Sequence, residues 1–218
     1  MMKRIITAII ACTLTFSVIP AYAFENSNSE KISKFTDVNV SDWYYKDVQF
    51  IVNYGLMNGE SSEKFNPNGV LTNAQVAQIF YNSGVKHKNV NEFIDIYGNE
   101  WYYNAVMECG EYFPVHWNRY EGGAMFLPNS PISRQELCYT ILRASGLSDE
   151  DIISQYESKH GQFEQGWRAY PEAALQLMVD MNIITGYGNG DYGGNDSLTR
   201  AQCAAILNRV ISLYGNIN

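Results

Sequence analysis

The 218-residue chain carries a formal net charge of −8, from 23 acidic and 15 basic residues. Because a net acidic chain is not drawn to nucleic acid or to anionic membranes by its overall field, neither is expected as a partner. Beyond the first stretch lie the cysteines Cys109, Cys138 and Cys203. Their odd number and their spacing predict neither a disulfide framework nor a metal site, so we expect them to be small buried residues.

Residues 1–23 have the composition of a secretory signal peptide. The charged pair Lys3-Arg4 precedes an apolar run over 5–19 and the small-x-small sequence Ala21-Tyr22-Ala23. We expect export, cleavage after Ala23 and no membrane insertion afterwards. A transmembrane anchor is an alternative, although the run is shorter than the roughly 20 apolar residues of a span. A lipoprotein attached at Cys12 is another. Residues 24–34 are polar and read as a flexible lead-in.

The next segment, residues 35–84, has the pattern of two helices joined by a loop. Apolar residues at helical spacing predict a first helix over Trp43–Tyr54, which Gly55 ends. A run of turn residues over 66–69 forms the loop, and a second helix follows Thr72.

Two further segments, 93–146 and 147–215, repeat this plan. In the second we predict helices near Tyr102–Tyr112 and Arg134–Ala144. In the third, more divergent one, Ser148 opens an extra helix to about Lys159, before helices over Tyr170–Asn182 and Arg200–Tyr214. A single helix–loop–helix unit of this size cannot bury its apolar face alone, so the three units are expected to pack together.

One five-residue pattern opens the second helix of every unit. It reads Leu71-Thr72-Asn73-Ala74-Gln75, then Ile132-Ser133-Arg134-Gln135-Glu136, then Leu198-Thr199-Arg200-Ala201-Gln202. A Ser or Thr followed three residues later by Glu or Gln is a helix capping box. The pattern therefore predicts three helix starts, each with a polar or cationic side chain at the first helical position.

The repeat extends upstream of the boxes. Gly59 and Gly186 stand at the same distance before the first and third boxes, whereas Tyr120 takes that place in the second, beside a longer connection. Phe-x-Asp sequences ending at Asp37 and Asp95 precede Trp43 and Trp101 in register; the third unit lacks a clear Phe-x-Asp and has Tyr170 in place of the tryptophan.

Taken together, these elements resemble the S-layer homology (SLH) domain, which typically occurs as three tandem copies. The resemblance covers nearly all of the chain after residue 23, and Gly186–Tyr192 leading to Leu198–Gln202 is its best match. It implies an all-α fold in which three helix–loop–helix repeats pack as a pseudo-threefold bundle. It also implies non-covalent binding to a pyruvylated secondary cell-wall polysaccharide, and a location at the cell wall or S-layer.

The repeated residues suggest how such a polymer would bind. The first turn of a helix has N–H groups without intrahelical partners and the positive end of the helix dipole, which favours anions. Arg134 and Arg200 are expected at exposed helix ends, where a planar guanidinium suits a carboxylate, while the neutral Asn73 makes its site weak. The full set of candidate ligand residues is Arg134, Arg200, Asn73, Trp43, Trp101, Asp37, Asp95, Gly59, Gly186 and Tyr187.

Several of these candidate ligand residues also have a structural explanation that involves no ligand. Both arginines are also consistent with surface ion pairs, both tryptophans with core packing, and Asp37 and Asp95 with capping of the following turn. Thr72, Ser133 and Thr199 are expected to act as caps, and His87, His116 and His160 as solvated residues.

The function we favour is an anchoring or structural module without catalytic residues, cofactor or metal. One alternative is an envelope protein whose sugar sites have decayed and which binds other envelope proteins. The other is a glycosidase acting on the wall with two carboxylates.

Overall fold

The computed structural model of the chain describes residues 30–85, 92–163 and 169–215. The expected signal peptide, its cleavage point and His87 lie outside these residues. None of the helices within them is long and apolar enough to cross a membrane.

Helices form nearly all of the regular structure, as predicted. They are α2 (Glu30–Ser33), α3 (Tyr45–Asn53), α4 (Asn73–Asn82), α5 (Tyr103–Cys109), the 3-10 turn η2 (Gly110–Tyr112), α6 (Arg134–Ala144), α7 (Asp149–His160), α8 (Ala169–Asp180) and α9 (Arg200–Gly215). The longer connection of the second repeat forms a hairpin that sequence analysis missed, with strands β1 (His116–Asn118) and β2 (Gly123–Met125).

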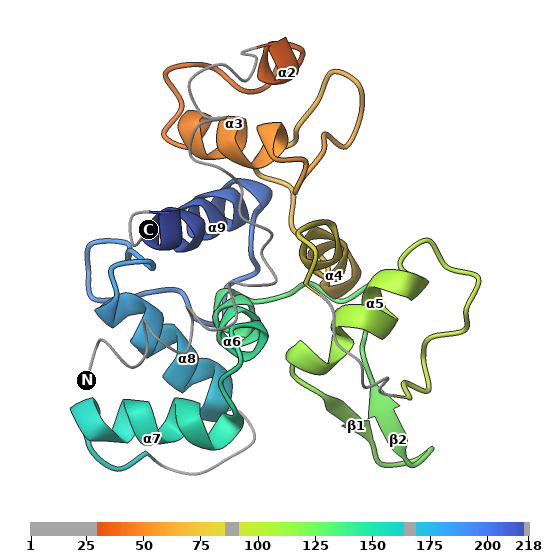
Figure 1. Ribbon diagram of the computed structural model, residues 1–218, viewed down its shortest axis with the longest axis vertical. Coiled ribbons are helices and arrows are strands. Elements are labelled where there is room, and N and C mark those ends of the chain that lie inside the picture. Colours follow the sequence, from red (N-terminus) through yellow and green to blue (C-terminus); the bar gives the residue numbers. More distant parts are fainter. Residues whose placement is uncertain (1–29, 86–91, 164–168, 216–218) are drawn as a thin grey trace.

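The three repeats pack on one another in a closed cycle. The first helix of each repeat packs on the second helix of the preceding repeat: α5 on α4, α8 on α6, and α3 on α9. Figure 1 shows α4, α6 and α9 around the centre of the molecule, with α5, α8 and α3 outside them. Contact between α3 and α9 joins the third repeat to the first, so no repeat completes its core without its neighbours.

A ring of three backbone hydrogen bonds lies where the repeats meet. The amide of Leu71 donates to the carbonyl of Leu198 at 2.9 Å, Leu198 donates to Ile132 at 2.9 Å, and Ile132 donates back to Leu71 at 3.1 Å. All three side chains are fully buried. They are the apolar residues that open the repeated pattern, which explains why that position is Leu or Ile in every copy.

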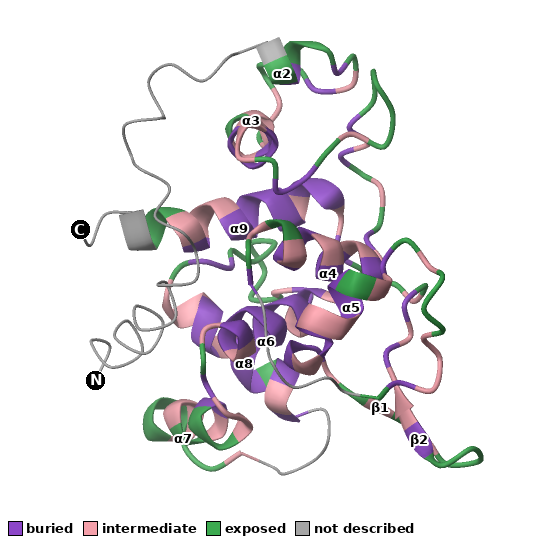
Figure 2. Ribbon diagram, turned by 45° about the vertical axis from the view of Figure 1, so that its right-hand side comes forward, coloured by how far each residue is buried: buried purple, intermediate pink, exposed green. Residues whose placement is uncertain are grey.

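All three predicted capping boxes are present. The hydroxyl oxygens of Thr72, Ser133 and Thr199 each accept the N–H three residues ahead, and the Gln or Glu at that position bonds back to the cap. Figure 2 shows that buried residues gather along α4, α6 and α9. Each of these helices thus starts with a local cap and then enters the shared core.

The cysteines behave as small core residues, as expected. Cys109, Cys138 and Cys203 are free and fully buried. Burial raises the pKa of Cys138 and of Cys203 to about 12, so both thiols stay protonated at neutral pH.

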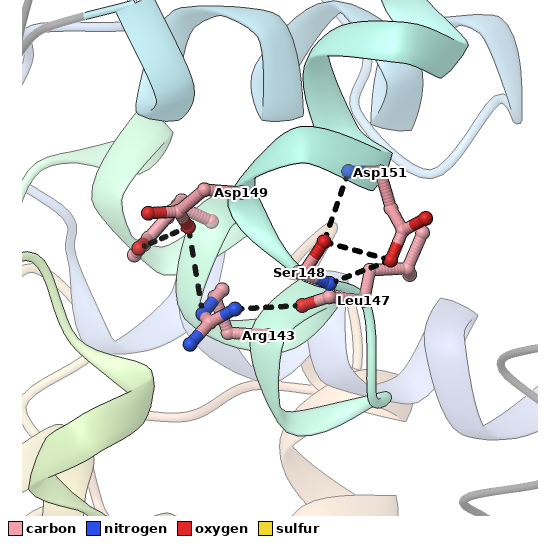
Figure 3. Close-up of polar contacts among 6 residues, drawn as sticks. Arg143, Leu147, Ser148, Asp149 and Asp151 are labelled. Atoms are coloured by element: carbon pink, nitrogen blue, oxygen red, sulfur yellow. Dashed lines mark hydrogen bonds and ion pairs between the residues drawn. The ribbon is translucent and has the colours of Figure 1, made fainter.

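The extra helix of the third repeat, α7, is tied to its surroundings at both ends. At its start, Asp151 and Ser148 form another capping box, and Arg143 of α6 approaches Asp149 at 3.6 Å while donating to the carbonyl of Leu147 (Figure 3). At its end, His160 lies 2.9 Å from Asp180 of α8. His160 is exposed, as expected, and helix packing also gives it Asp180 as a partner.

Candidate functional site

The residue after each capping Ser or Thr reaches into the loop of the next repeat. Arg200, in the third repeat, donates from Nε to the carbonyl of Phe65 at 2.7 Å and from Nη2 to the carbonyl of Asn58. Its guanidinium also lies over the Phe65 ring, 4.6 Å from the centroid. We call this contact the 3–1 junction, because the third repeat holds the loop of the first.

Arg134 makes the equivalent contact one repeat earlier. Its Nε donates to the carbonyl of Tyr192 at 3.0 Å and its Nη2 to the carbonyl of Thr185 at 3.2 Å. The guanidinium lies 5.6 Å from the ring centroid of Tyr187, whose hydroxyl donates to Asp196. This contact is the 2–3 junction.

Asn73 occupies the same place at the 1–2 junction. Its amide nitrogen donates to the carbonyls of Phe126 and Leu127, both at 3.1 Å. An amide NH2 has two hydrogens, so these two bonds use its whole donor capacity. Asn73 holds the loop as the arginines do, but it brings no charge and leaves no donor for another group.

The expected exposure of the arginines is wrong. Arg134 and Arg200 are only 5% and 6% exposed, because each side chain enters the loop of the neighbouring repeat. The alternative of a surface ion pair is wrong for the same reason, and within the described residues neither arginine forms an ion pair.

The first-turn N–H groups are not open to an anion, contrary to the sequence hypothesis. At the 3–1 junction the amides of Arg200 and Ala201 donate to the carbonyls of Gly69 and Pro67 of the first repeat. The third first-turn amide, that of Gln202, donates to the capping hydroxyl of Thr199. The other two junctions repeat this arrangement. Neighbouring repeats therefore satisfy the donors that an isolated helix would offer to a ligand.

One donor group of each arginine remains available. Nη1 of Arg134 and of Arg200 has no hydrogen-bond partner among the described residues, and neither atom is among the fully buried polar atoms that lack one. Burial lowers the pKa of Arg200, and nearby acidic groups, chiefly Glu60, oppose that shift. Each arginine thus combines a mostly desolvated charge with one terminal nitrogen that has no partner among the described residues.

The two repeated aspartates hold the loops from the other side. Asp37 accepts the amides of Phe65 and Asn66 at 2.9 and 2.8 Å, and Asp95 accepts those of Phe126 and Leu127 at 2.9 and 2.7 Å. Burial opposes ionisation of Asp37, but the two backbone donors outweigh it, so its pKa lies below its usual value. Both aspartates therefore have a structural role, but in a loop 28 to 32 residues downstream and not in the turn that directly follows them.

The loop glycines have a steric role. A Cβ at Gly59 would lie 2.4 Å from the Phe35 ring, and one at Gly186 would lie 2.7 Å from the carbonyl of Asp191. In the second repeat the hairpin replaces this tight loop. Tyr120 therefore stands at an open turn, fully exposed, and no glycine is needed there.

Trp43 and Trp101 are not core residues, so the packing alternative is wrong for both. They are 65% and 64% exposed at equivalent places just before α3 and α5. Each packs edge-on against the tyrosine that follows it, with ring centroids 5.3 and 5.2 Å apart. Two large aromatic faces are thereby held in fixed orientation at the surface.

Sequence reasoning missed the partners of the arginines. The carbonyls of Asn58 and Thr185 come from loops far along the chain from Arg200 and Arg134. The repeat register contained one clue, since the two carbonyls occupy equivalent positions just before Gly59 and Gly186.

Comparison with known proteins adds a family and three relatives. The S-layer homology domain matches residues 34–77 and 167–204, within the first and third repeats. The Surface-layer 125 kDa protein of Lysinibacillus sphaericus is 25% identical over 186 residues, which cover 82% of this chain and 15% of that protein.

Two similar proteins are named as enzymes. An amylopullulanase of Thermoanaerobacterium thermosulfurigenes is 21% identical over 84% of this chain and 10% of its own length. An endoglucanase of Bacillus sp. (strain KSM-635) is 18% identical over 96% of this chain and 22% of its own length. The chain spans less than a quarter of each of the three relatives, so their named activities are not carried over to it.

Proposed function

We propose that this chain, which matches the S-layer homology domain over residues 34–77 and 167–204, is a cell-surface anchoring module that binds a pyruvylated secondary cell-wall polysaccharide without catalysis. The proposed sites are the 2–3 and 3–1 junctions, with the 1–2 junction weak. Export through the signal sequence would place the module at the wall or S-layer.

Two buried arginines that form no ion pair with any described residue carry this proposal. Burying a charge is costly unless it is paired, and carbonyl oxygens alone compensate Arg134 and Arg200 only in part. A carboxylate at Nη1 would complete each site. A pyruvate ketal supplies such a carboxylate on a sugar ring. The side of the guanidinium formed by Nε and Nη2 already holds the loop, so the carboxylate would approach Nη1 end-on.

Exposed tryptophans support a sugar as the ligand. Trp43 belongs to the repeat whose loop Arg200 holds, whereas Trp101 belongs to the second repeat, whose loop Asn73 holds at the weak 1–2 junction. An indole presents a large rigid apolar face with little conformational entropy to lose, which suits stacking on a pyranose ring. In this proposal Asp37, Asp95, Gly59, Gly186 and Tyr187 shape the loops that orient the ligand.

The decisive experiment is titration of the chain that begins at Phe24 with purified pyruvylated wall polysaccharide. Arg134→Gln and Arg200→Gln imitate the natural Asn73, since the amide can still hold the loop while the charge is lost. Hydrogen bonds to charged groups contribute about 1.5–3 kcal/mol, so each variant should bind roughly tenfold to a hundredfold more weakly at its junction. Trp43→Ala should weaken binding, whereas Tyr97→Ala, an exposed aromatic control, should not; the two side chains are 65% and 78% exposed.

Thermal melts of every variant separate loss of binding from loss of fold. If the double arginine variant melts like the parent and binds the polymer as tightly, the junction sites are wrong. If the parent itself fails to sediment with wall sacculi while remaining folded, the protein-binding alternative gains support. Release of reducing ends from the polymer would instead indicate the glycosidase.

A further inference from the structure

The β1–β2 hairpin is a feature of the second repeat alone among the described residues. Its strands pair in antiparallel register, with Trp117 opposite Ala124. On its inner side β2 is fixed to the start of the repeat, where Ile94 donates to the carbonyl of Ala124 at 2.9 Å and packs against Gly123. Strand β1 is therefore the outer edge, and the hairpin is a firm projection from the bundle (Figure 1).

The exposed residues of β1 and of the turn that follows it include a large aromatic residue and a cation. Alternate residues of a strand share a face. Val115 and Trp117 are 51% and 66% exposed. His116 and Asn118, which alternate with them, are half-buried. Arg119, the next alternate position, begins the turn and is exposed. It forms no hydrogen bond or ion pair with any other described residue.

The hairpin is joined along the chain to the junction that lacks a cation. Strand β2 runs directly into Phe126 and Leu127, whose carbonyls accept both hydrogens of Asn73. Asn73 brings no guanidinium to the 1–2 junction and has no remaining side-chain donor. The repeat whose loop Asn73 holds is also the one that carries Trp117 and Arg119 on its hairpin and the following turn.

We infer that the outer face of the hairpin is an additional subsite for an acidic sugar of the wall polymer. The indole of Trp117 stacks on the pyranose ring, and the guanidinium of Arg119 pairs with its carboxylate. The Cα atoms of residues two apart in the chain are separated by at most about 7 Å, which suits one ring and an appended carboxylate. The hairpin then supplies a cation to the repeat whose loop is held by the neutral Asn73. This inference rests on the proposed function, since it takes the same polymer as ligand.

A defined ligand pair tests the subsite: a synthetic pyranoside carrying a pyruvate ketal, and the same pyranoside with the ketal carboxylate methyl-esterified. Binding to the chain from Phe24 is measured in an Arg134→Gln, Arg200→Gln background, where the hairpin site is isolated. Trp117→Ala should weaken binding of the acid about fivefold or more, and Trp117→Phe should restore part of it. Arg119→Gln should weaken it about two- to fivefold, as expected for an exposed ion pair, and should not change binding of the ester. Glu121→Gln, in the same turn, is the matched control and should bind like the background protein.

The possible outcomes separate the subsite from the proposed function. If wild-type chain binds the wall polymer and the hairpin variants bind the acid as the background protein does, the subsite is overturned while the junction sites stand. Equal losses for acid and ester in Arg119→Gln would overturn the carboxylate contact. If wild-type chain does not bind the polymer at all, both proposals fail. A Trp117→Ala variant that changes the protein from dimer to monomer in sedimentation would make this face a contact between copies and would also overturn the subsite.

Discussion

Replacing Arg200 by Ala should destabilise the fold, because this side chain closes the cycle of repeats. It is 6% exposed and joins α9 to the carbonyls of Asn58 and Phe65, 142 and 135 residues earlier in the chain. Sequence reasoning alone expected little change in folding, since it placed the arginine at an exposed helix end. The two views therefore predict different unfolding behaviour.

The size of the effect follows from the contacts that are lost. Two hydrogen bonds from a charged donor contribute about 1.5–3 kcal/mol each, and the alanine leaves both carbonyls without this partner. Removing a mostly buried charge that lacks a counter-ion offsets part of that loss. We expect a decrease of about 2–4 kcal/mol in the free energy of unfolding. Arg200→Gln should lose less, because its amide can keep a bond to the loop as Asn73 does.

Urea denaturation without ligand measures this decrease in the chain that begins at Phe24. Arg209→Ala is the matched control on the same helix, where a half-buried arginine makes one bond, to the carbonyl of Ile183 at 2.8 Å. It should cost only about 1 kcal/mol. If Arg200→Ala loses less than the Arg209→Ala control, with unchanged m-values, the guanidinium does not hold the repeats together and the ring-closure account is wrong.

Three further outcomes are expected. Thr199→Ala should lower the free energy of unfolding by about 1 kcal/mol, because it removes the acceptor for the Gln202 amide; an unchanged urea midpoint would contradict a cap there. The pKa of Asp37 is depressed in the folded state, so its contribution is present above its unfolded pKa of about 3.9 and is lost as pH falls through the lower folded value. Asp37→Asn should accordingly lose less stability than the parent between about pH 4 and pH 2, and parallel pH profiles of the urea midpoint would refute this sign. The exported protein should begin at Phe24, which N-terminal sequencing of cell-wall extracts checks; a chain that retains residues before Ala23 would exclude cleavage at the predicted site.

Local features of this protein were readable from its sequence. A capping box involves residues three positions apart, so the starts of α4 and α6 could be predicted from Thr72 with Gln75 and from Ser133 with Glu136. The repeated register likewise predicted a fold of three helix–loop–helix repeats, because equivalent residues in the copies are expected to have equivalent environments. The apolar residue before each box pointed to the core for the same reason.

Residue environments that depend on distant segments could not be read in this way. An arginine at the first position of a helix normally faces solvent, yet a loop from another repeat covers Arg200. Exposure of Trp43 also required the three-dimensional structure, since a lone tryptophan on an apolar helical stripe is most simply read as core. The strands of the hairpin were too short to leave a clear alternation in the sequence.

The sequence by itself therefore determined the helix starts, the repeat and the family resemblance, all of which depend on spacing within one copy. Only the tertiary structure decided that the first helix of each repeat packs on the preceding repeat, and that α3 therefore packs on α9. It also decided that the side chain at the first position of each second helix holds the loop of the next repeat. The physical reason is that the loop contacts of Asn73, Arg134 and Arg200 join residues more than 50 positions apart, and that the helix contacts join elements of different repeats. Their partners are selected by how three apolar faces can be buried together, and no short stretch of sequence specifies that choice.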